Sequence, residues 1–235
     1  MKEIIIYRDP YNIELLLIGV LIAALVISLV RRRQHPRLRH FPLYLAALLL
    51  LFPLSYIGLA QTLKQDNQVK SINYFFHYDY IVTLIEFLVF IRFFRSEIKH
   101  VIARKILQLL TVGFVAYFFF ELVNDNFFYK SISEQTQARV YTVESLILVL
   151  PCAFYFIEMF KDPMKSKLSE EPGFWIASGL SFFVLCTLPF SLAENFLRKN
   201  HPQTMLQMYS IFYVFYILLT LLIIRAYLCR RKEAI

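Results

Sequence analysis

The sequence predicts an all-α integral membrane protein, a single domain spanning residues 1–235 that crosses the bilayer seven times. Hydrophobic residues make up 58% of its 235 residues and the mean hydropathy is +0.55, whereas a soluble domain usually has about 45–50% apolar residues. The excess is gathered into blocks of about 18–24 residues separated by short polar stretches, and about 20 apolar residues are needed to cross the hydrocarbon core. Basic residues stand at the ends of these blocks, where they anchor membrane helices.

The first block is predicted to be a retained transmembrane helix rather than a signal peptide. It ends in Arg31-Arg32-Arg33, whereas a signal peptide carries its positive charge before the apolar run. The third block is the most polar, because it holds Asp79, Glu86 and Arg92. The predicted spans are residues 13–30, 41–61, 74–94, 106–123, 140–160, 174–196 and 205–228.

Lysine and arginine residues orient the predicted bundle. Of the 25 such residues, 17 follow or end the first, third, fifth and seventh spans, and 8 lie on the other side. Cytoplasmic loops carry the excess of positive charge. We therefore expect the N-terminus outside and the C-terminus in the cytoplasm, in a bacterial inner (plasma) membrane.

Polar side chains recur at helical spacing within the third to seventh spans, as on helices that share one interior. An ionisable group at membrane depth is costly, usually faces the bundle interior and often marks function. The candidate residues are Asp79, Thr83, Glu86, Glu121, Tyr141, Glu144, Glu194 and Tyr213.

The predicted orientation places these acids in the outer half of the bilayer, where no lysine or arginine is expected to pair with them. Several unpaired carboxylates in a low dielectric must be protonated, hydrated or bound to a cation. One hypothesis is an outward-open pocket lined by acids and tyrosines, suited to a cationic or hydrogen-bonding ligand, with Glu86 and Glu144 deepest. The alternative is structural, with the acids at the membrane boundary or acting as protonated donors between helices.

At the inner side, Glu158 is expected near the depth of Arg92 and Arg225. An ion pair of Glu158 with either arginine is one interpretation, and snorkelling of the arginines to the headgroups is the other. Pro151 and Pro189 fall within the fifth and sixth spans and predict kinks there.

Several function classes are disfavoured by the sequence. The last span has no lysine for a retinal Schiff base, and the five histidines lie at span ends or in loops. There is no Walker A or HExxH motif, and the short connections leave no room for a catalytic, nucleotide-binding or nucleic-acid-binding domain. We therefore expect no enzyme, cofactor, metal site or nucleic-acid partner; the partners expected are the lipid bilayer and an effector protein.

Five runs carry a resemblance to known proteins: Tyr141-Thr-Val-Glu-Ser145, Leu150-Pro-Cys152 followed by Tyr155-Phe-Ile-Glu158, Pro172-Gly-Phe-Trp-Ile176, Pro189, and Arg225-Ala-Tyr-Leu-Cys229. Over roughly residues 140–230 the chain resembles bacterial seven-helix proteins encoded as stand-alone membrane proteins beside small sensor histidine kinases. It is also broadly similar to the seven-helix sensory modules fused to such kinases, but it lacks the kinase. The resemblance implies a sensory role with a histidine kinase or other membrane partner.

Three main functions stay open at this point. The first is a non-enzymatic sensory or signalling subunit that acts through a partner protein. The second is a small-solute or cation-coupled transporter, although the internal repeat common in such carriers is not seen. The third is a structural subunit of a membrane assembly.

Overall fold

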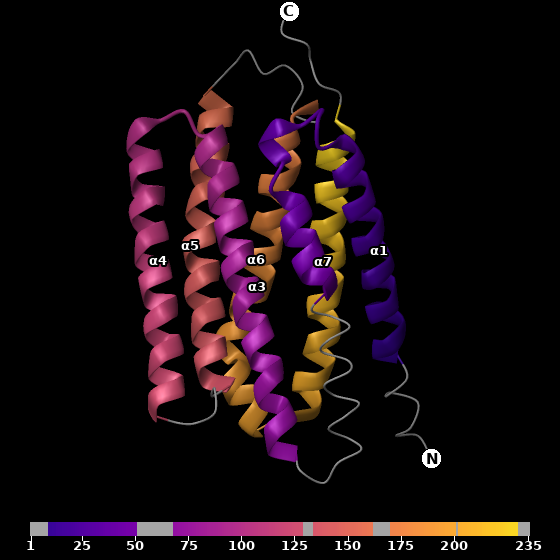
Figure 1. Ribbon diagram of the computed structural model, residues 1–235, viewed down its shortest axis with the longest axis vertical. Helices are drawn as coiled ribbons and strands as arrows, with labels where there is room; N and C mark the ends of the chain where they lie inside the picture. Colours follow the sequence, from indigo (N-terminus) through magenta and orange to yellow (C-terminus); the bar gives the residue numbers. More distant parts are fainter. Residues whose placement is uncertain (1–8, 51–67, 129–133, 162–169, 201, 230–235) are drawn as a thin grey trace, which may run out of the picture.

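The computed structural model describes residues 9–50, 68–128, 134–161, 170–200 and 202–229, and the regular structure in these ranges is helical, with no strand. Figure 1 shows the long helices running side by side along the bundle axis. Residues 41–50 are also helical, and the remainder of the predicted span 41–61 lies outside the described residues. The elements are α1 (Asp9–Arg31), the short 3₁₀ helix η2 (Pro36–Leu38), α3 (Gln68–Glu97), α4 (Val101–Phe128), α5 (Glu134–Lys161), α6 (Pro172–Asn200) and α7 (Pro202–Leu228).

Five of the helices are long and apolar enough to cross a membrane, so the chain has the character of a multi-pass membrane protein. The 30-residue α3 is not one of the five; it contains the predicted span 74–94 with its acids and Arg92. The five stretches are Ile13–Arg31, Val101–Asn124, Ala138–Lys161, Pro172–Ala193 and Ile211–Leu228.

The outer surface of the bundle is apolar along these helices. Leu109 is 74% exposed, Phe120 64% and Leu192 64%, and all three lie within these stretches. A soluble protein rarely leaves large contiguous apolar patches in water. Acyl chains cover such surface at no cost, and this explains why helices of this composition can pack with only one side inward.

The helices pack in an order that differs from their order in the chain. α1 packs on α7, α7 on α6 and α6 on α5, while α3 contacts both α4 and α5. In Figure 1, α4 and α5 stand at one side of the bundle and α1 and α7 at the other. The helices that contain Glu86 (α3) and Glu144 (α5) are therefore direct neighbours.

Aromatic side chains hold the helical residues 41–50 against α3. The rings of Phe41 and Tyr44 each meet Phe90 edge-on, with centroids 5.4 Å apart in both pairs. Phe41 also meets Phe93 at 5.5 Å. These contacts fix the depth of Tyr44 at about one helical turn from Glu86.

The helices α1, α3, α5 and α7 all end at one end of the bundle, which is uppermost in Figure 1. Each carries a basic residue in its last turn: Arg31, Arg95, Lys161 and Arg225. Cations there offset the negative end of each helix dipole. We call this end of the bundle the basic end.

The turn around η2 is tied down at the basic end by Tyr227 of α7. Its hydroxyl donates to the Leu38 carbonyl at 2.5 Å, and Arg31 Nη1 donates to the Tyr227 carbonyl at 3.2 Å. His35 packs edge-on against the Tyr227 ring. As a result, the residues that follow η2 are placed beside the last turns of α3.

Candidate functional site

Two buried acids meet inside the bundle. Glu86 lies in the middle of α3 with 3% of its surface exposed, and Glu144 lies in α5 with 4% exposed. Their carboxyl groups are close enough to interact electrostatically. Two carboxylates at short range in a low dielectric do not both stay ionised, so at least one of them must carry a proton or share a cation.

Three tyrosines surround the two acids. Tyr44 from residues 41–50 is 1% exposed, and its hydroxyl faces Glu86 and lies within electrostatic range of Glu144 and Tyr141. Tyr216 of α7 interacts in the same way with both acids and with the other two tyrosines. We call Tyr44, Glu86, Tyr141, Glu144 and Tyr216 the carboxylate cluster; it joins residues 41–50 with α3, α5 and α7.

The cluster contains a polar atom that the described part of the chain does not satisfy. Glu144 Oε1 is fully enclosed and has no hydrogen-bond partner among the described residues, whereas the enclosed Tyr44 hydroxyl is directed at the Glu86 carboxyl group. Within the same residues, no lysine, arginine or histidine comes within 4.0 Å of either acid. Buried polar atoms are nearly always satisfied in folded proteins, so orphans of this kind call for an explanation.

The expected opening toward the outside is not seen around Glu86 and Glu144, because both side chains have almost no accessible surface. Thr83 is buried one turn before Glu86, and Tyr213 is half-buried one turn before Tyr216, against the core. The structure therefore brings five of the predicted residues into the cluster or beside it: Thr83, Glu86, Tyr141, Glu144 and Tyr213. Asp79 and Glu194 belong to α3 and α6, but their side chains lie outside the described residues.

Glu121 differs from the two buried acids, because it has a basic partner. Arg139 Nη1 of α5 lies 3.9 Å from Glu121 Oε1, and the Glu121 side chain is 8% exposed. The expectation that no basic residue could pair with the outer acids is wrong for Glu121. The predicted fifth span began at residue 140, which left Arg139 in a loop, whereas α5 begins at Glu134 and carries Arg139 inside the helix.

Of the two interpretations for the inner side, the ion pair of Glu158 with Arg92 or Arg225 is not formed in this structure. Glu158 instead accepts two backbone hydrogen bonds, from the Lys99 amide at 2.8 Å and the His100 amide at 2.6 Å, just before α4 begins. The Arg225 guanidinium lies over the Trp175 ring, 5.4 Å from its centroid. Arg92 lies elsewhere, on the exposed side of α3.

The donor set of the cluster limits what it can hold. Among the described residues, no group of three or more His, Cys, Asp or Glu side chains is arranged to bind a metal ion. Two carboxyl groups and three phenols can bind a proton, a weakly held monovalent cation or a small cationic ligand. Such an arrangement can change its charge without a redox step or a covalent step.

Sequence reasoning missed Tyr44, which stands as an isolated polar residue in an apolar block and belongs to no periodic stripe. Tyr216 had a signal, because it continues the spacing of Tyr213 and Thr220 along one face of α7.

Comparison with known proteins gives no relative of this chain: no protein-family model, no curated protein and no solved structure matches it.

Proposed function

We propose that the chain is a seven-helix, non-enzymatic sensory or signalling subunit of a bacterial plasma membrane, oriented with its basic end in the cytoplasm. Its stimulus would be a proton or a small cation taken up by Glu86 and Glu144. Its output would pass through a partner protein, and a membrane histidine kinase is the partner class that the sequence resemblance implies. Residues 41–61 and α3 would supply the two spans beyond the five apolar helices.

The observation that carries this proposal is the pair of buried, unpaired acids. An intramembrane acid without a cationic partner lowers the stability of the protein. A purely structural bundle would be more stable with an apolar residue in its place. Proton or cation uptake changes the charge at the point where four elements meet. A change there alters the packing of α3, α5, α7 and residues 41–50 together, which is what a sensor needs.

The same acids would serve a cation-coupled carrier, and this is the second candidate. Pro151 lies seven residues after Glu144 on the same face of α5 and removes a backbone hydrogen bond there. α5 continues through Pro151 as one helix, but a missing hydrogen bond near an ionisable pair is a weak point of the kind that transporters use. The two candidates differ in output, because a carrier moves solute and a sensor does not.

Infrared difference spectroscopy tests the stimulus on the full-length protein in lipid nanodiscs. A step in pH or in sodium concentration should change the carbonyl stretch of a buried carboxyl group. Glu86→Gln and Glu144→Gln should each abolish this change. Glu121→Gln is the matched control, and it should leave the change intact because Glu121 is already paired with Arg139. An unaltered signal in both cluster variants would refute the site.

The output needs a separate measurement. Cross-linking in native membranes should capture a partner protein, and the amount captured should change when Glu86 or Glu144 is neutralised. Proteoliposomes should show no net solute or cation flux. Flux that disappears in Glu86→Gln would instead establish the carrier. An amount of captured partner that stays the same when either acid is neutralised would refute the signalling role.

A further inference from the structure

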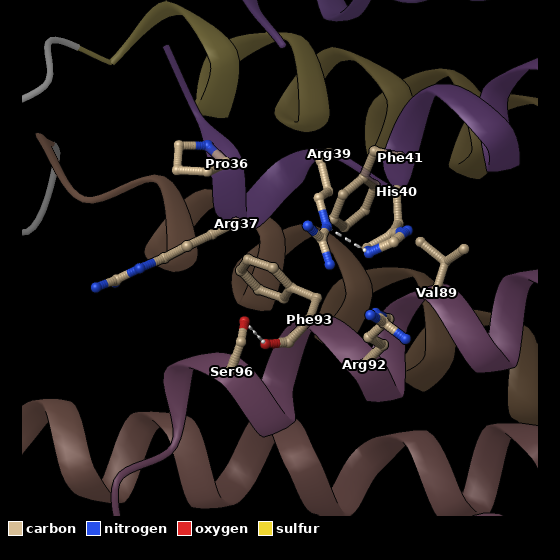
Figure 2. Close-up of a pocket in the computed structure, with 9 residues that line it drawn as sticks. All are labelled: Pro36, Arg37, Arg39, His40, Phe41, Val89, Arg92, Phe93 and Ser96. Atoms are coloured by element: carbon tan, nitrogen blue, oxygen red, sulfur yellow. Dashed lines mark hydrogen bonds between the residues drawn. The ribbon is translucent and has the colours of Figure 1, made fainter. Parts of the chain in front are cut away.

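A pocket of about 270 Å³ opens at the basic end between the turn after η2 and the last turns of α3. Figure 2 shows Arg39 and His40 entering it from the turn and Arg92 from α3, with Ser96 at one side. Phe41 and Phe93 form its apolar wall and are buried. The pocket is distinct from the carboxylate cluster, since none of the five cluster residues lines it.

The positive charge in this pocket is uncompensated within the described residues. Arg37 also lines it, but its guanidinium is paired with Glu97 at 3.1 Å, and in Figure 2 its side chain extends away from Arg39 and Arg92. Arg39 Nε donates to His40 Nε2 at 2.9 Å, which makes His40 a neutral acceptor. Arg92 has no ion pair or hydrogen bond to a described residue, and no carboxylate lines the pocket.

The pKa of His40 reflects the positive charge around the pocket. Partial burial and the neighbouring Arg92, Arg39 and Arg32 lower the pKa of its imidazole below the usual 6.5. A site that resists a further positive charge favours an anion. Arginine guanidinium groups with free donors match the geometry of phosphate oxygens in particular.

Below the pocket the same two helical faces become apolar and stay exposed. Leu88 lies one turn from Arg92 on α3 and is 40% exposed, and Leu43 lies one turn from Arg39 and is 61% exposed. Farther along the two faces, Ile81 is 56% exposed and Leu50 67%. A charged pocket at the top of an exposed apolar face has the layout of a headgroup above acyl chains.

We propose that this pocket binds the phosphate headgroup of an anionic phospholipid, held by Arg39 and Arg92, while the acyl chains lie along Leu43 and Leu88; the Ser96 hydroxyl already donates to the Phe93 carbonyl at 2.7 Å and serves only as part of the wall. A soluble phosphate would satisfy the arginines but would leave the apolar face unused. Basic pockets between membrane helices bind anionic headgroups by this chemistry. The bound lipid would join residues 39–43 to α3, directly above Tyr44 and Glu86.

Native mass spectrometry of the full-length protein, titrated in detergent with phosphatidylglycerol or phosphatidylcholine, tests the proposal. Phosphatidylglycerol should bind with a clear preference. Arg92→Gln and Arg39→Gln should each weaken its binding about fivefold, the effect of one basic contact near a membrane surface. Arg95→Gln removes the same charge from the same helix outside the pocket, and it should leave the affinity unchanged. Thermal unfolding without anionic lipid should be equal in all three variants, which excludes misfolding.

Two results would overturn the proposal. Equal losses in all three arginine variants would mean general attraction to the basic end rather than a site. Displacement of the lipid by inorganic phosphate or glycerol phosphate at equal concentration would mean that the pocket takes soluble phosphate and that the apolar face has no role.

The pH dependence gives a second, independent readout. A bound phosphate offsets the charges of Arg32, Arg39 and Arg92 around His40, while Arg37 stays paired with Glu97, so binding should raise the pKa of His40. Between the free and bound pKa values of His40, lipid binding takes up a proton, and affinity should therefore rise as the pH falls through that interval. His40→Gln should remove this dependence, and a slope retained in His40→Gln would contradict the assigned geometry.

Discussion

At the scale of single residues, the carboxylate cluster lowers the stability of the fold, because it buries a polar atom that no described residue satisfies. Glu144 Oε1 is enclosed without a hydrogen-bond partner among the described residues. A buried acceptor left unsatisfied costs about 1–3 kcal/mol. Polar groups retained at such a cost are typical of sites where an occupant, here a proton or a cation, completes the interactions.

Glu144→Met should therefore stabilise the protein while it destroys the site. Methionine has a similar length and no unsatisfied oxygen, so the free energy of unfolding should rise by about 1–3 kcal/mol. Thermal or denaturant unfolding in detergent measures this. Leu148→Met, one turn later and equally buried, should cost less than about 1.5 kcal/mol. Lower stability for Glu144→Met would mean that Glu144 already makes favourable interactions.

At the scale of elements, close packing depends on small residues. A Cβ at Gly179 of α6 would lie 3.1 Å from Leu222 Cβ and 3.2 Å from Leu219 Cδ1 of α7. Membrane helices approach closely only where such small residues meet a neighbour. Tyr216 belongs to α7, so this close contact between α6 and α7 helps to hold Tyr216 in the cluster.

Gly179→Ala should destabilise the protein by about 1–3 kcal/mol, because overpacking forces α6 and α7 apart. Gly113→Ala in α4 is the matched control, because nothing lies within 4 Å of its added Cβ. That control should be neutral or stabilising by up to about 1 kcal/mol, since alanine favours the helix. Unfolding in detergent compares the two, and equal effects would show that α6 and α7 are not closely packed at Gly179.

The start of α4 depends on a side chain from another helix. Glu158 of α5 accepts hydrogen bonds from the amides of Lys99 and His100. These amides precede the first helical turn and have no partner within α4. A carboxylate at this position also complements the positive end of the helix dipole.

Glu158→Ala should cost about 0.5–2 kcal/mol, as the loss of a helix cap does. Hydrogen exchange gives the local readout: the Lys99 and His100 amides should exchange faster. The Phe174 amide at the start of α6, bonded to the Glu171 carbonyl at 3.1 Å, should stay unchanged. Protection of Lys99 and His100 that survives the substitution would show that another group caps α4.

At the scale of the whole molecule, charge and apolar surface are arranged along one axis. The four helices that end at the basic end bring their last-turn cations together, and the sides of the bundle expose leucine, isoleucine, valine and phenylalanine. Lysine and arginine are retained on the cytoplasmic side during insertion. The distribution of charge thus favours a single orientation in the membrane.

Cysteine labelling tests that orientation. In a background with Cys152, Cys186 and Cys229 replaced by alanine, a membrane-impermeant maleimide should label Asn200→Cys in intact cells. It should label Arg33→Cys only after permeabilisation, because the proposed orientation places the basic end in the cytoplasm. The reverse pattern would invert the proposed topology.

The sequence by itself determined the helical class and most element positions. The predicted spans 140–160 and 174–196 correspond to the apolar stretches Ala138–Lys161 and Pro172–Ala193. Whether a segment suits a membrane depends on its own length and apolarity, and both can be read locally. The inward placement of Glu86 and Glu144 was also predicted, because a costly charge at membrane depth turns away from lipid.

Only the tertiary structure decided which groups meet. Tyr44 joined the cluster because Phe41 and Phe90 fix the depth of residues 41–50, and a single tyrosine in an apolar block has no periodic signal. Glu158 met backbone amides, which every residue except proline carries, and not one of the two arginines considered from the sequence. Arg39 and His40 came together with Arg92, although 51 residues of chain lie between His40 and Arg92. Contacts between helices depend on the depth and rotation of each helix relative to its neighbours. Packing sets both, and the residue pattern of a single helix does not contain them.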